Sequence, residues 1–122
     1  MKTRLTSVAI FALLAIAGYC QQYDIQANYD KQEVYITMRD GVRLFTSIYT
    51  PKDQAQRYPI MMMRTPYSVR PYGDAYRTSL GPSSDFASSG YIFVYQDVRG
   101  RYMSEGDFKW MTPFIPNKKP GD

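Results

Sequence analysis

Histidine is absent from this chain of 122 residues, and cysteine occurs once, as Cys20. Without histidine, the chain alone can assemble neither a Ser-His-Asp triad nor a metal site with histidine ligands. A single cysteine excludes an internal disulfide. The folded part must therefore be held together by an apolar core, to which twelve tyrosines and six phenylalanines contribute large aromatic surfaces.

A strong excess of one charge is lacking too. The formal net charge is +4, but Lys2 and Arg4 fall in an N-terminal segment that reads as a leader. Without these two, 13 basic and 11 acidic residues remain, a difference of +2. The basic residues are dispersed apart from the Lys118-Lys119 pair, which is typical of a solvated surface. We therefore expect no nucleic-acid partner.

Residues 1–20 form a predicted secretory signal peptide. The uncharged apolar run Val8–Ala17 follows Lys2 and Arg4. It is shorter than the roughly 20 apolar residues that span a bilayer, so we expect no membrane span. No polar stripe interrupts the run, which argues against the alternative of a buried helix. The protein is thus predicted to be secreted or periplasmic.

Two cleavage sites fit the leader. Ala15-Ile16-Ala17 matches the A-x-A rule, and Gly18-Tyr19-Cys20 is the second candidate. Cys20 also raises the alternative of a lipid anchor. That alternative is disfavoured because such signals want a small residue before the cysteine, and Tyr19 is large.

The exported part begins with polar residues 21–32, for which we predict a flexible lead-in. Two strand-like runs follow, Val34–Met38 and Val42–Tyr49. The Asp40-Gly41 pair between them is a strong signal for a β-hairpin. Pro51 is expected to end the second strand.

Two further runs are apolar throughout. Tyr58–Met63 and Tyr91–Tyr95 are typical of strands that are buried on both faces of a parallel sheet. The methionines Met61–Met63 are interpreted as core packing, since a thioether metal site would want Cys or His ligands as well. Pro82–Ser89 predicts a short crossover helix with Gly90 as its stop.

The order of hairpin, buried strand, short helix and buried strand predicts an α/β fold, a parallel sheet with an antiparallel edge. A single crossover helix leaves at least one large sheet face uncovered, whereas parallel sheets are normally covered on both faces. Residues 33–122 are therefore predicted to be the N-terminal portion of a larger domain.

Four segments form a recognisable pattern when they are taken together. They are Met38–Leu44 with Tyr49–Pro51, Arg64–Tyr67, Phe86–Tyr91, and Gln96–Gly100 with Ser104–Gly106. In this order they resemble the N-terminal part of the α-amino-acid ester hydrolase, glutaryl-acylase and X-Pro dipeptidyl-peptidase group of α/β-hydrolases, which includes cocaine-esterase-like enzymes. The likeness covers nearly all of the exported part but a small share of the family's length.

The resemblance implies an exported serine hydrolase that acts on ester, amide or short peptide substrates through an acyl-serine intermediate and needs no cofactor. The family's G-x-S-Y-x-G nucleophile, acid and histidine would lie beyond residue 122, so the chain alone is expected to be inactive. Ser83 offers the nearest match, but its segment lacks the second glycine and precedes a short crossover helix rather than a sharp elbow.

One catalytic residue is implied within the chain. The resemblance assigns Tyr67 to the oxyanion hole, where its hydroxyl would donate to the tetrahedral intermediate. Pro66 restricts the backbone before it, and Thr65 is held extended. The alternative is an ordinary buried tyrosine.

The loop after the last strand is interpreted as scaffold for the active-site floor. Asp97 and Arg99 are expected to form an ion pair within it, and Gly100 permits a turn. Glu105 and Asp107 are two residues apart, and we expect solvated charges rather than a catalytic pair.

A second hypothesis is a small, exported, non-catalytic β-rich binding module. Exposed aromatic side chains such as Tyr72, Tyr76 and Tyr102 would then stack on sugars or peptides.

Overall fold

The computed structural model describes residues 23–110 and residue 117. The predicted leader, with Cys20 and both cleavage sites, lies outside these described residues, as does most of the C-terminal tail.

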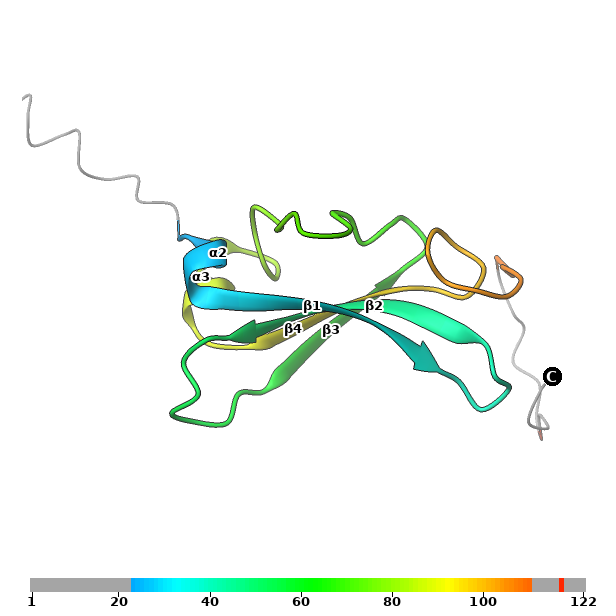
Figure 1. The fold of residues 1–122 in the computed structure, drawn as a ribbon, viewed down its shortest axis with the longest axis horizontal. Helices are drawn as coiled ribbons and strands as arrows, with labels where there is room; N and C mark the ends of the chain where they lie inside the picture. The colour runs from blue at the N-terminus through cyan, green and yellow to red at the C-terminus, as the bar shows by residue number, and fades with distance from the viewer. Residues whose placement is uncertain (1–22, 111–116, 118–122) are drawn as a thin grey trace, which may run out of the picture.

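Two short helices and four strands follow one another in the described part of the chain. They are α2 (Ile25–Asn28), β1 (Tyr29–Thr37), β2 (Arg43–Pro51), β3 (Ile60–Thr65), α3 (Ser84–Ser88) and β4 (Ile92–Asp97). The strands form one sheet in the order β1-β2-β4-β3 (Figure 1). β1 and β2 are antiparallel, as are β2 and β4, whereas β3 and β4 are parallel. The predicted α/β order, with its hairpin and parallel crossover, is confirmed.

The hairpin begins earlier than predicted. Residues 21–32 were expected to be a flexible lead-in, but β1 starts at Tyr29 and pairs with β2 from that residue onward. Before it, Asp24 caps α2 by accepting a hydrogen bond from the Ala27 N–H at 3.0 Å. Ile25 and Tyr29 are both buried in the core. The expectation is therefore wrong for residues 25–32, where two apolar anchors among polar neighbours fix the segment.

The core lies on one face of the sheet. Alternate residues of a strand point to the same face, and the buried aromatic residues follow that alternation on β1, β2 and β4. They are Tyr29, Phe45, Tyr49, Phe93 and Tyr95. α2 and α3 pack at one end of this face, and segment 66–82 runs along it (Figure 1).

The crossover from β3 to β4 contains the short helix predicted for it. α3 begins after Ser83, and Gly90 follows its end with φ +78°. Ser83 has extended backbone at the start of this helix, so it does not form a strand-to-helix elbow. Among the described residues, no helix is long and apolar enough to cross a membrane.

β3 differs from its prediction. It was expected to be buried on both faces, but Ile60 is 68% exposed, Met62 49% and Met63 43%. Of the methionines interpreted as core packing, only Met61 is packed against the core. Ile60 and Met62 are exposed because they point to the face opposite to both described helices. Met63 points to the core face but is exposed because β3 forms an edge of the sheet. Both described helices leave the sheet face expected to be uncovered without a helix, although Leu44 and Thr46 on that face are buried.

Candidate active site

Because β3 and β4 are parallel, the two loops that follow them leave the sheet at the same end, at the carboxyl ends of the strands. This end is called the carboxyl edge, or the Tyr67 edge, below. Thr65 and Asp97, the last residues of these strands, are paired across the ladder, and the Val98 N–H donates to the Thr65 carbonyl at 3.2 Å. Segment 66–69 and the loop of residues 98–108 therefore leave the sheet side by side. Open α/β sheets bind their ligands at this carboxyl edge.

Tyr67 lies on this edge, in the first turn after β3. It is 69% exposed in the described part of the chain, where it is not a buried tyrosine. Its backbone N–H donates to Thr65 Oγ1 at 3.0 Å, and the next residue, Ser68, has φ +72°. The ring thus projects from a backbone that is locally fixed while its hydroxyl stays accessible.

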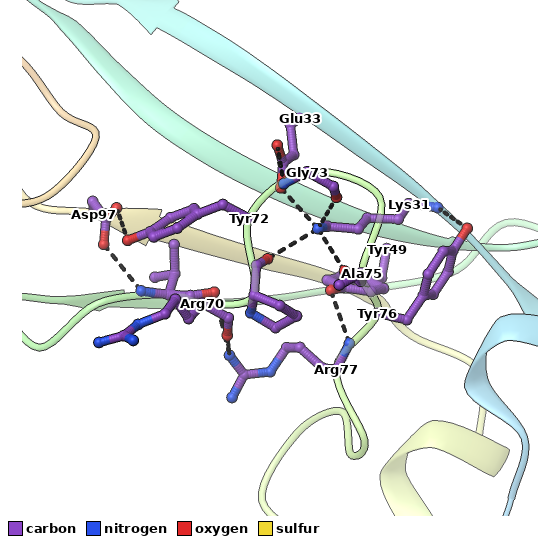
Figure 2. A network of polar contacts seen from close by, with 12 residues as sticks. Lys31, Glu33, Tyr49, Arg70, Tyr72, Gly73, Ala75, Tyr76, Arg77 and Asp97 are labelled. Carbon is purple, nitrogen blue, oxygen red and sulfur yellow. Dashed lines mark hydrogen bonds and ion pairs between the residues drawn. The ribbon is translucent and has the colours of Figure 1, made fainter.

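Asp97 is fully buried and accepts hydrogen bonds from both loops. Its Oδ1 accepts from the Val69 N–H at 3.1 Å, and its Oδ2 accepts from the Tyr72 hydroxyl at 2.8 Å and from the Met103 N–H at 3.4 Å. Figure 2 shows Tyr72 reaching this carboxylate. Burial raises the pKa of the Tyr72 phenol, and the bond to Asp97 adds to the rise.

The predicted ion pair between Asp97 and Arg99 is wrong. Arg99 instead pairs with Asp40 in the β1–β2 turn, with 2.8 Å between Nη1 and Oδ2. This hydrogen-bonded pair holds the pKa of Asp40 below its ordinary value. Asp97 belongs to β4 and points into the core, whereas Arg99 lies past the strand end, so the two side chains diverge. Arg99 thereby connects the loop to the hairpin.

Gly100 allows the loop to fold back on itself. Its φ is +69°, and its N–H donates to the Glu105 carbonyl at 2.9 Å. A Cβ at this position would lie 2.2 Å from the Phe108 backbone nitrogen. Only glycine fits here, because both the backbone conformation and the close approach exclude a side chain.

Glu105 is a solvent-accessible charge, as expected, with 41% of its side chain exposed, but it also has a partner that was not expected. It accepts from the Arg43 backbone N–H at 3.0 Å and from Arg43 Nε at 2.9 Å. These bonds to Arg43 hold the pKa of Glu105 below its ordinary value. Asp107 is exposed, as expected. Glu105 therefore fastens the loop to the start of β2 rather than forming half of a catalytic pair.

Ser104 was quoted only as part of a motif, yet it joins three segments. Its Oγ donates to the Asp97 carbonyl at 2.7 Å and accepts from the Phe45 N–H at 2.9 Å. A buried hydroxyl that bridges two strands in this way makes the loop after β4 part of the rigid sheet.

Lys31 was missed because it fell in the segment predicted to be flexible. Its side chain is 3% exposed, and its Nζ pairs with Glu33 Oε1 at 2.8 Å. The same Nζ donates to three carbonyls of segment 71–75, those of Pro71 at 2.9 Å, Gly73 at 2.6 Å and Ala75 at 2.8 Å (Figure 2). The ammonium thus clamps segment 71–75 onto β1.

Two aromatic residues proposed for a binding surface are packed inward instead. Tyr72 and Tyr76 are half-buried against the core, and the Tyr76 hydroxyl accepts from the Lys31 N–H at 3.2 Å. Of the three residues named for that hypothesis, only Tyr102 is largely exposed, at 51%. This arrangement argues against stacking of sugars or peptides by Tyr72 and Tyr76.

The described residues provide no metal cluster at the Tyr67 edge. Residues 23–110 and 117 contain no group of three or more His, Cys, Asp or Glu side chains that could hold a metal ion. A cavity of about 340 Å³ lies beside α2 and α3, where Tyr23, Tyr29 and Tyr58 line it. It is at the opposite end of β3 and β4 from Tyr67.

Comparison with known proteins identifies the family. Residues 40–118 match the X-Pro dipeptidyl-peptidase (S15) family. The cocaine esterase of Rhodococcus sp. (strain MB1 Bresler) is 36% identical over 87 residues, which are 69% of this chain and 14% of that protein. The chain thus spans about one seventh of that relative's length.

Two solved structures show the same likeness. An α-amino acid ester hydrolase is 38% identical with a TM-score of 0.55, over 84% of this chain and 18% of that one. An aminopeptidase from a marine sediment Thaumarchaeota archaeon is 40% identical with a TM-score of 0.52, over 67% and 14%. The chain, an incomplete N-terminal part of an α/β-hydrolase domain, therefore belongs to the X-Pro dipeptidyl-peptidase (S15) family of hydrolases.

Proposed function

We propose that the protein is an exported serine hydrolase in which Tyr67 donates its hydroxyl to the oxyanion of the tetrahedral intermediate. The observation that carries the proposal is the position of Tyr67. It is an exposed phenol on a fixed turn at the carboxyl edge of the parallel pair, within the matched family segment. Such a donor acts best when its direction is set before the reaction starts.

The rest of the chemistry comes from residues outside these 122, because the sequence has no histidine to act as a base. A serine activated by that histidine attacks the carbonyl carbon, and the carbonyl oxygen takes the negative charge that Tyr67 stabilises. The intermediate then collapses to the acyl-serine by breaking the ester or amide bond, and the histidine gives its proton to the departing alcohol or amine. Water attacks the acyl-serine in the same way, which releases the acid and restores the serine. No cofactor takes part.

The substrate is an ester, an amide or a short peptide with an acyl, aminoacyl or X-Pro group. Support comes from the relatives, which are named as a cocaine esterase, an α-amino acid ester hydrolase and an aminopeptidase. All three names describe acyl transfer to water, for which an oxyanion donor is the shared requirement.

The first test is to sequence the transcript past codon 122. We expect the frame to continue into a G-x-S-Y-x-G segment, an acid and a histidine; the product of that frame is called the complete enzyme below. A stop codon, with no such segment in any nearby frame, would contradict the proposal and favour a binding module.

In the complete enzyme, Tyr67→Phe should lower kcat on an activated ester by about 10²–10³, since one oxyanion donor is lost. KM should change little, because the interaction exists mainly in the transition state. Tyr58→Phe is the matched control, since this tyrosine just before β3 loses the same atom at the opposite end of the strand. Equal kcat values for Tyr67→Phe and the control would overturn the role of Tyr67.

The 122-residue chain alone should be inactive. Assayed on the same ester, it should give no turnover above its own Tyr67→Phe variant. Turnover well above that variant would show that the chain contains a nucleophile that the proposal places elsewhere.

A further inference from the structure

The backbone that carries Tyr67 is held from both sides by residues of β4 and its following loop. On the N-terminal side, Arg101 Nε donates to the Pro66 carbonyl at 3.1 Å. On the C-terminal side, the Val69 N–H donates to Asp97 Oδ1 at 3.1 Å. Tyr67 and Ser68 are the only residues between these two anchored peptide groups.

Arg101 is itself fixed in place. Its guanidinium lies over the Phe108 ring at 4.9 Å and near the Tyr102 ring at 5.4 Å. Its backbone N–H donates to the Val98 carbonyl at 3.1 Å, and its carbonyl accepts from the Ser104 N–H at 3.0 Å. A planar guanidinium stacked on a ring loses little further freedom when it forms a hydrogen bond.

Asp97 is fixed more tightly still. It is the last residue of a central strand, it is fully buried, and its own carbonyl accepts from Ser104 Oγ at 2.7 Å. A buried carboxylate needs donors, and the Val69 N–H is one of the three that it receives. Moving Val69 would leave part of that charge unsatisfied.

The turn between the anchors would not hold its shape unaided. Ser68 has φ +72°, a left-handed conformation that a residue with a side chain adopts at a cost. Such a conformation persists where surrounding contacts determine it. The bonds from Arg101 and Asp97 are contacts of this kind.

We propose that Arg101 and Asp97 are positioning residues that set the direction of the Tyr67 hydroxyl. They act on Tyr67 through its neighbours Pro66 and Val69 and do not touch the substrate. The inference rests on the proposed oxyanion role of Tyr67. It adds that the loop after β4 holds the Tyr67 hydroxyl in its donor direction before the reaction starts. No free energy is then needed to orient the hydroxyl during the reaction.

The kinetic test is a double-mutant cycle in the complete enzyme. Arg101→Met keeps most of the apolar stem but removes the donor to Pro66, and it should lower kcat about ten- to hundredfold with little change in KM. In the Tyr67→Phe background, the same substitution should cause almost no further loss, because the group it positions is already gone. Arg57→Met, at an exposed arginine of the β2–β3 connection, is the matched control.

An equal loss from Arg101→Met in both backgrounds would overturn the proposal, since Arg101 would then act independently of Tyr67. Arg101→Lys restores a cation but not the planar donor, so its kcat should stay close to that of Arg101→Met. A full return of kcat in Arg101→Lys would overturn the role of the planar contact, since the charge alone would then suffice.

A second measurement does not depend on activity. Hydrogen exchange of the Tyr67–Val69 amides should be about tenfold faster in Arg101→Met and in Asp97→Asn than in the unmodified protein, because a hydrogen bond holding the segment is lost or weakened. Unchanged exchange in both variants would overturn the positioning role. If Tyr67→Phe leaves kcat unchanged, the proposed function fails, and the exchange data still decide whether the segment is held.

Discussion

At the scale of single residues, two glycines with the same backbone conformation have different surroundings. Gly100 has φ +69° and Gly73 has φ +70°. A Cβ on Gly100 would meet the backbone of Asp107 and Phe108, whereas a Cβ on Gly73 would meet nothing within 4 Å. Substitutions at these two glycines therefore separate the free-energy cost of the left-handed conformation from the free-energy cost of the steric contact.

We therefore expect Gly73→Ala to lower the free energy of unfolding by about 1–2 kcal/mol, the cost of the left-handed conformation alone. Gly100→Ala should cost about 3 kcal/mol or more, because the methyl group also forces the loop open. Unfolding in urea measures both values. Equal losses would show that the close approach at Gly100 is not maintained in solution.

The sequence motifs indicated which residues shape the Tyr67 edge but not how they are paired. The turn at Gly100 was predicted, since a turn signal is a local feature. The family motif pointed to Tyr67, whose role stays a prediction. The partners of Asp97 were not predicted. The direction of a side chain at the end of β4 depends on the twist of the strand and on where the strand ends, and a local motif shows neither. Arg99 pairs with Asp40 and Asp97 with Val69 and Tyr72, contacts that span 59, 28 and 25 residues.

At the scale of elements, the hairpin and the crossover were predictable because each carries a local signal. Asp40-Gly41 marks the turn, and Pro82 with Gly90 brackets the helix. The early start of β1 was not predictable, because its residues are mostly polar and the strand binds segment 71–75, which is far away in the sequence. Lys31 makes this contact, although in the sequence pattern it looks like an ordinary surface charge.

Lys31→Met should lower the free energy of unfolding by about 3 kcal/mol, because Glu33 and three carbonyls of segment 71–75 lose a buried cation. Lys52→Met is the matched control. The Lys52 Nζ donates to the Gln26 carbonyl in an exposed place, so its loss should cost less than about 1 kcal/mol. Comparable losses in urea unfolding would contradict the clamp.

At the scale of the whole molecule, one sheet face is packed and the other, called the open face below, is partly exposed in the described part of the chain, although Leu44 and Thr46 are buried on it. Ile36, Ile60 and Met62 are exposed on the open face, and β3 forms an unpaired edge of the described sheet. Exposed apolar strands at a sheet edge promote association. This feature follows from a chain that spans 14–18% of its relatives.

The 122-residue chain should therefore self-associate, and Met62→Lys should reduce the association by placing a charge on the open face. Gln54→Lys, at an exposed residue between β2 and β3, adds the same charge elsewhere and should have little effect. Sedimentation velocity over a range of concentrations measures the difference. A chain that stays monomeric and unfolds cooperatively would instead favour an independent binding module.

The clamp of Lys31 also bears on the order of folding. Its carbonyl partners at Pro71, Gly73 and Ala75 lie 40–44 residues later in the chain. During synthesis the N-terminal hairpin is made first, and a hairpin forms within microseconds, far faster than residues are added. When segment 71–75 emerges from the ribosome, both strands of the hairpin, with the cation that will bind this segment, have already been made.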